Sequence, residues 1–239
     1  MLHRIFQFYF LLMLAVGARA GTPPLLNEAV RKWVADQDRW AYTQHVCLIK
    51  EDKVTQERVE RFDPSLPAER QWQLLEVSGK PPTAAQRKTW QKKKERELHQ
   101  RSEKPLGDYF NFERATVAEE TSELVRYEVP LLPDTESRYP LEKISVLMTV
   151  RKDRQVLDQL TAGLRESFRM ALGTARVTNL GLDIHFRTID EHFSSQPESI
   201  HFNGGLQVGG CFKVGGRAEL AWTDFKRVTP YKDRFIHKG

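Results

Sequence analysis

Three groups of residues in this chain could do chemistry: a glycine-rich segment, a few histidines near acids, and two cysteines. The segment 203–220, NGGLQVGGCFKVGGRAEL, contains three Gly-Gly pairs. A phosphate-binding loop needs its glycines between a strand and the start of a helix, so that backbone amides and the helix dipole converge on the anion. Strand-like residues follow each pair here and no helix begins. The segment therefore favours turns and kinks of a curved sheet over a phosphate site.

The histidines closest to acidic residues are His185 and His192, which lie near Asp183, Asp190 and Glu191. A metal site needs three or four ligands on a rigid frame, and the chain has no His-x-His or His-Glu-x-x-His spacing. Asp183 and His185 share the polar face of one expected strand, which is ordinary for a solvated face. The sequence therefore predicts no metal site and no cofactor.

The cysteines, Cys47 and Cys211, allow two interpretations. A disulfide between them would close a long loop, worth roughly 4–5 kcal/mol in the chain-entropy model. Two buried free thiols are the equally open alternative. As a nucleophile, Cys47 has no base beyond His45, which shares its strand face, and no Gly-x-Ser-x-Gly elbow exists. We therefore expect a protein that is not an enzyme.

The N-terminus has the composition of a signal peptide. Residues 1–4 form a short basic start, residues 5–16 are apolar apart from Gln7, and Ala18-Arg19-Ala20 supplies small residues at a cleavage site. The apolar run is shorter than the roughly 20 residues that span a bilayer, and a buried N-terminal helix is the less consistent alternative. We expect cleavage after Ala20, which leaves 21–239 as a single soluble periplasmic domain.

The net charge argues against a nucleic-acid partner. The formal charge of the whole chain is +5, and cleavage removes two arginines and no acid. A mildly basic exported protein lacks the strong positive potential that nucleic-acid binding requires.

Two helices are expected in the first half of the chain. Residues 25–40 place an apolar stripe on one broad face, with Asn27 as a possible cap. That stripe consists of Leu26, Val30, Trp33, Val34 and, less regularly, Trp40. Residues 83–101 form a second helix that is polar nearly all round, capped by Thr83 or started by Pro82. Its run Lys92, Lys93 and Lys94 could contact an anionic membrane surface, although a solvated face is the simpler interpretation.

Elsewhere the hydrophobic period is two, which is typical of antiparallel strands. A hairpin is expected from 41–50 and 54–62 around a turn at 51–53, and Gln71–Val77 should be a strand. Alternation continues from residue 109 to the C-terminus without a βαβ rhythm. The pattern predicts an α+β fold of about ten antiparallel strands and two main helices.

The most specific signal is the segment 61–83, RFDPSLPAERQWQLLEVSGKPPT, followed directly by the basic helix. It resembles an uncharacterised family of exported bacterial proteins with an Asp-Pro-Ser, a Trp-x-Leu-Leu-x-Val strand and a Gly-Lys/Arg-Pro-Pro-Thr turn into a helix. Here these motifs occupy 63–65, 72–77 and 79–83. The segment 215–228, GGRAELAWTDFKRV, is similar to the closing strand of that family. Proline and glycine in these motifs fix where the chain turns across the sheet as a helix.

Proteins of this kind resemble the superfamily of the periplasmic lipoprotein carrier LolA. The resemblance implies a strongly curved antiparallel sheet, an unclosed β-barrel, with helices over its concave face and acyl chains between them. We expect a non-catalytic periplasmic carrier for an amphiphile, a lipid or a lipidated protein. The residues expected to line its ligand site are Leu26, Val30, Trp33, Val34, Trp72 and Leu182, for which core packing is the alternative role. The alternative function is an envelope interaction or sensor domain with a packed core and no ligand.

Overall fold

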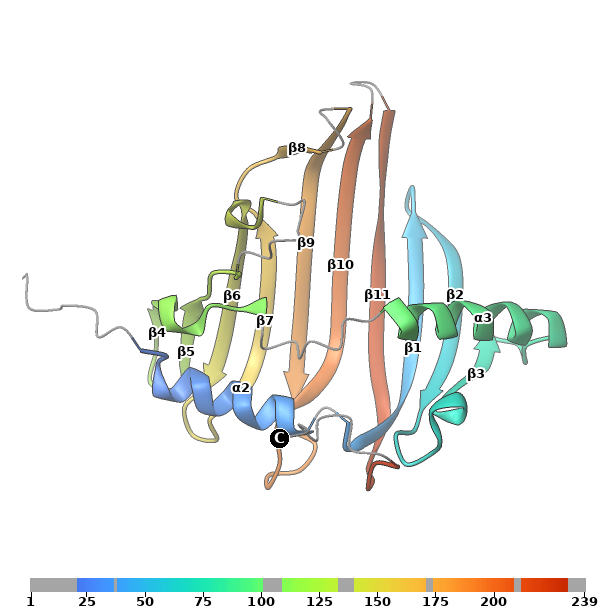
Figure 1. Cartoon of the computed structure of the whole chain (residues 1–239), viewed down its shortest axis with the longest axis horizontal. Coiled ribbons are helices and arrows are strands. Elements are labelled where there is room, and N and C mark those ends of the chain that lie inside the picture. Colours follow the sequence, from blue (N-terminus) through green and yellow to red (C-terminus); the bar gives the residue numbers. More distant parts are fainter. Residues whose placement is uncertain are drawn as a thin grey trace, which may run out of the picture.

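The computed structural model describes residues 21–36, 38–100, 109–132, 140–170, 174–208 and 212–231. Within them the chain forms one antiparallel sheet of eleven strands (Figure 1). The strand order is β3-β2-β1-β11-β10-β9-β7-β6-β5-β4, and β8 pairs with β9 beside this path. The expected signal peptide, residues 1–20, lies outside the described residues.

The sheet is open, because β3 and β4 are its two edges and do not pair with each other. The strands are β1 Trp40–Lys50, β2 Lys53–Phe62, β3 Trp72–Val77, β4 Thr116–Glu120, β5 Leu124–Glu128, β6 Ile144–Arg151, β7 Val156–Leu164, β8 Phe168–Met170, β9 Ala175–Arg187, β10 Gln196–Val208 and β11 Phe212–Arg227. The two helices are α2 Pro24–Asp36 and α3 Ala84–Gln100. The prediction of an unclosed antiparallel sheet with two helices is thus confirmed.

The first helix differs from its prediction at both ends. It begins at Pro24 rather than after Asn27, because proline lacks the amide that the first turn would leave unbonded. It ends at Asp36, and Trp40 belongs to β1, where it pairs with Arg227 on β11. Trp40 is therefore not part of the apolar stripe of α2, contrary to the prediction.

The second helix starts as its sequence predicts. The Thr83 amide donates to Gln86 Oε1 (2.8 Å), and the Gln86 amide donates to Thr83 Oγ1 (3.2 Å). These reciprocal bonds form a capping box, which satisfies two amides of the first turn. Figure 1 shows the helix crossing in front of β3, β2 and β1.

The glycine pairs are placed differently from the prediction. Gly204 and Gly205 on β10 pair with Gly216 and Gly215 on β11, so both pairs lie inside strands and not in turns. The predicted kink is present, because the register between β10 and β9 shifts after Gly205. The third pair, 209–210, lies outside the described residues.

Both helices lie on the same face of the sheet, which we call the inner face. Side chains of directly paired residues share a face, and one such row runs across six strands. From β7 to β2 the row is Leu160, Ile184, Ile200, Leu220, Val46 and Arg58. Leu160 belongs to the core under α2. At the other end, Arg58 donates a hydrogen bond to Glu60, which also accepts hydrogen bonds from α3. The inner face is therefore continuous from one helix to the other.

Candidate functional site

The part of the inner face under α2 is filled. Leu26, Val30 and Trp33 are buried, and Val34 packs against the same cluster. Trp33 meets Phe186 of β9 edge to face, with ring centroids 5.6 Å apart. Leu182 packs on the margin of this core. Five of the six predicted ligand residues thus come together, in a packed seam between helix and sheet.

The sixth predicted residue, Trp72, lies at the other end of the sheet. Its ring is 4.8 Å from that of Phe62 and 6.2 Å from that of Tyr42, measured between centroids. The ammonium of Lys94, from α3, lies 3.7 Å from its centroid. Trp72 is therefore part of an aromatic cluster associated with α3 and does not approach the α2 seam.

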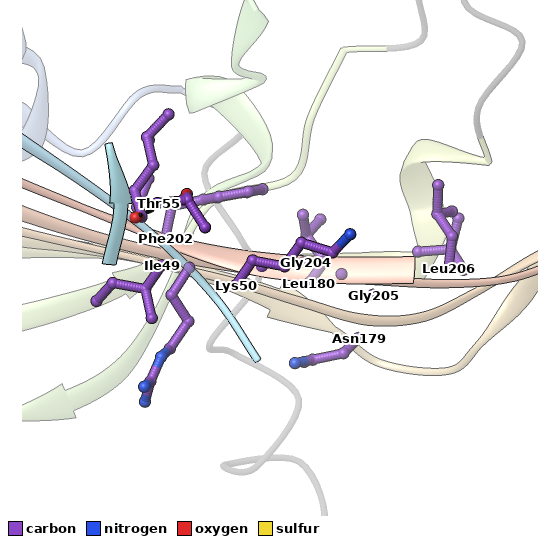
Figure 2. Close-up of a pocket in the computed structure, with 15 residues that line it drawn as sticks. Ile49, Lys50, Thr55, Asn179, Leu180, Phe202, Gly204, Gly205 and Leu206 are labelled. Atoms are coloured by element: carbon purple, nitrogen blue, oxygen red, sulfur yellow. Dashed lines mark hydrogen bonds between the residues drawn. The ribbon is translucent and has the colours of Figure 1, made fainter. Parts of the chain in front are cut away.

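An apolar trough occupies the inner face where neither described helix covers it. It has a volume of about 700 Å³ and lies over β1, β9, β10 and β11. Its apolar side chains are Leu48, Ile49, Val177, Leu180, Phe202, Leu206 and Ala218, and its polar ones are Lys50, Thr55, Asn179 and Arg217. Phe202 is 39% exposed and Leu206 is 36% exposed, and the two lie next to each other along one face of β10, so they form a contiguous apolar patch. In Figure 2, Leu206 projects from one side of the strands and Asn179 from the other.

The floor of the trough is bare backbone, formed by the two paired Gly-Gly segments of β10 and β11. A Cβ on Gly215 would lie 2.6 Å from the Gly204 carbonyl oxygen, so no side chain fits there. A Cβ on Gly204 would lie 3.1 Å from the Phe202 ring. The glycines thus leave the trough open where side chains would otherwise fill it.

The most unusual polar group of the inner face is Glu60 of β2, which is fully buried. It accepts hydrogen bonds from Lys94 Nζ (2.8 Å), from Trp90 Nε1 (2.7 Å) and from Arg58 Nε. Burial by itself raises the pKa of the Glu60 carboxyl, but the Lys94 charge and these hydrogen bonds outweigh it and hold the pKa below its ordinary value. Glu60 is therefore an ionised anchor for α3.

This anchor changes the interpretation of the lysine run. Lys94 is only 14% exposed and bonds to Glu60, whereas Lys92 is exposed. Lys93 lines a cavity between α3 and the sheet. Lys94 is therefore not available for the expected contact with an anionic membrane surface.

The cavity between α3 and the sheet has a volume of about 400 Å³. Its lining includes Gln56, Arg58, Leu74, Val77, Trp90 and Lys93. Arg58 Nη1 is buried and has no hydrogen-bond partner among the described residues. A buried donor without an acceptor costs free energy, so this atom marks a place where an acceptor would be stabilised.

The outer face carries the residues first considered for catalysis. Gln159 donates to Asp183, and His185 lies 3.3 Å from the same carboxylate. Within the described residues, no three histidine, cysteine or acidic side chains are placed to hold a metal ion. Burial and two neighbouring carboxylates raise the pKa of the Cys47 thiol, which therefore stays protonated at neutral pH.

Cys47 is a free thiol in the structure. Its predicted disulfide partner, Cys211, lies outside the described residues, so the pairing stays a prediction. The structure tests neither of the two interpretations of the cysteine pair further.

Sequence reasoning missed the trough and the Glu60 anchor. Glu60 looked like one of several charged residues in an alternating strand, and only the register places it under α3. A signal existed for the anchor, because Trp90 and Lys94 are four residues apart and so share one face of a helix. The trough had a signal as well, in the alternation of Phe202, Gly204 and Leu206.

None of the described helices is long and apolar enough to cross a membrane. Comparisons of the chain with family models, with curated proteins and with solved structures find no match. The site must therefore be interpreted from its own geometry.

Proposed function

We propose that this protein is a non-catalytic carrier that binds the apolar chain of an amphiphile, a lipid or a lipidated protein, in the trough of the inner face. The observation that carries this proposal is the apolar trough of about 700 Å³, which the described helices leave uncovered beside the packed seam under α2. Ligand sites are mostly apolar hollows of roughly 300–1,000 Å³.

The chemistry of the trough supports an acyl chain as its occupant. Its lining combines aliphatic side chains, one aromatic ring and four glycines with four polar side chains, and a chain lying on the apolar part would gain roughly 0.8 kcal/mol for each methylene removed from water. The glycine floor allows close approach of a chain that makes no directional bonds. The ligand residues are then Leu180, Phe202 and Leu206, in place of the α2 stripe.

Saturable binding of a fluorescent long-chain fatty acid tests the proposal. Phe202→Ser and Leu206→Ser should each weaken binding severalfold, because each removes apolar contact from the trough. The matched control is Val117→Ser, which removes an apolar side chain that is 55% exposed on edge strand β4. A wild-type protein that never saturates with the probe would exclude the carrier function.

A protein-interaction or sensor domain without a ligand is the second candidate. The observation in its favour is the seam under α2, where the described side chains of helix and sheet pack into one buried core. This candidate requires that the trough be covered by another protein. Probe titration separates the two, since an interaction domain gives no saturable binding of a monomeric fatty acid.

The LolA-like resemblance and export to the periplasm belong to the same proposal. An open antiparallel sheet with two helices on one face supports the resemblance at the level of architecture. Export requires removal of residues 1–20, so N-terminal sequencing of the mature protein should start at Gly21. A product that retains Met1 would contradict it.

A further inference from the structure

We propose that the cavity under α3 binds the anionic head of the amphiphile, a carboxylate or a phosphate, through Arg58 and Lys93. This inference rests on the proposed carrier function and assigns a second part to the same site. The trough takes the chain, and the cavity takes the head.

The first argument is the unsatisfied donor. Arg58 uses Nε to bond Glu60, while its Nη1 is buried with no acceptor among the residues that the structure describes. The Glu60 carboxylate also accepts from Lys94 and Trp90, so it is already shared among three donors. An anionic oxygen in the cavity would give Arg58 the acceptor that Glu60 does not supply, and such charge-assisted bonds are the strong ones.

The second argument is the charge of the lining. Arg58 and Lys93 are the charged residues that line the cavity, and no acidic residue of the described chain lines it. Gln56 and Gln86 add amide groups that can donate to the same anion. The cavity therefore selects a negative head over a neutral or positive one.

The third argument is continuity with the trough. Phe202, Ala218, Leu48 and Gln56 are successive cross-strand partners on β10, β11, β1 and β2. The first three line the trough and the last lines the cavity, so one row of the inner face joins them. Three strand spacings, about 14 Å, separate the ends of this row. A single amphiphile can lie along it with its head under α3.

The test compares three ligands with the same sixteen-carbon chain: the alcohol, the carboxylate and the alkyl phosphate. Each displaces the fluorescent fatty acid from the intact mature protein. We expect at least one anion to bind roughly tenfold or more tightly than the alcohol, as one buried charge-assisted bond allows. Whichever anion binds more tightly identifies the head as a carboxylate or a phosphate.

Two variants locate the preference. Arg58→Met should abolish the preference, so that within this variant the anions and the alcohol bind with equal affinity. Lys93→Gln should reduce the preference in part, without touching the Glu60 anchor. Lys92→Gln is its matched control, because Lys92 is an exposed lysine on the same helix that does not line the cavity.

The outcomes separate the two proposals. Equal affinities for alcohol and anions, or a preference that survives Arg58→Met, would overturn the head site and leave the carrier function intact. Failure of all three ligands to bind would overturn the carrier function and the head site together. If Arg58→Met does not fold, as thermal melting will reveal, the comparison of Lys93→Gln with Lys92→Gln decides.

Discussion

The two helices lie on the same face of the sheet, but different kinds of interaction attach them to it. α2 buries an apolar stripe against β6 and β7, and Trp33 and Leu26 belong to the main core. α3 is polar nearly all round, and the bonds of Lys94 and Trp90 to Glu60 attach it. The α2 contact is non-directional and spread over many atoms, whereas the α3 contact is concentrated on one carboxylate.

This difference assigns different roles to the two ends of the inner face. Hydrophobic burial holds the α2 seam together, so we expect this seam to stay closed as long as the domain is folded. A helix held by one ionic cluster can detach while the sheet stays folded, because local opening needs less free energy than global unfolding. In the proposed carrier, the cavity under α3 is therefore the part of the site that would open to admit a ligand head.

The largest expected effect is on the α2 seam. Trp33→Ala should lower the free energy of unfolding by about 3–5 kcal/mol, because it empties a buried site against Phe186. Urea denaturation followed by circular dichroism measures this directly. A loss below about 1 kcal/mol would mean that α2 is not part of the cooperative core.

Next in size is the anchor of α3. Glu60→Gln removes the charge that two cations share and should cost on the order of 3 kcal/mol. Because the loss is local, hydrogen exchange of α3 amides should accelerate far more than that of α2 amides. Glu57→Gln, at an exposed position of the same strand, is the matched control. Equal acceleration in both helices would remove the distinction between them.

The pH dependence of amide exchange should differ between the two helices. The pKa of Glu60 in the folded protein lies below the ordinary glutamate value of 4.5, so its stabilising effect is complete above that value. This stability is lost as the pH falls through the lower folded pKa. The protection of the α3 amides, their exchange rate relative to that of an unfolded chain at the same pH, should therefore stay constant from neutral pH to about 5. It should fall only in stronger acid. In Glu60→Gln this pH dependence should disappear; its persistence would assign it to another group.

The smallest expected effect is at the trough. Phe202→Ser should lower the free energy of unfolding by about 1 kcal/mol, less than the other two changes, because the ring is 39% exposed and lies outside the buried core cluster. Under the proposed function the same variant should weaken ligand binding, so Phe202 should matter more for binding and Trp33 more for stability. A large destabilisation would show that Phe202 belongs to the core.

Sequence periodicity predicted the elements well, because alternation and amphipathicity are local. The hairpin around Glu51 and Asp52, the strand 72–77 and the capping box at Thr83 all follow from short segments. What it could not predict depends on strand register and on which helix covers which strand. Pairing of Gly204 with Gly216 depends on the register of β10 against β11, and the position of Glu60 under Lys94 joins residues 34 apart in sequence. The predicted ligand site therefore fell mainly on the apolar stripe of α2, which is apolar because it packs against the sheet.

The central claim is that the trough binds an apolar chain while the α2 seam stays closed. Methyl NMR of leucine-labelled mature protein, titrated with a long-chain fatty acid below its micelle concentration, tests it most directly. We predict saturable shifts of the Leu48, Leu180 and Leu206 methyls, with the buried Leu26 methyls unmoved. Shifts centred on Leu26 and Leu160 of the α2 core, or no saturable shift at any leucine, would contradict the account.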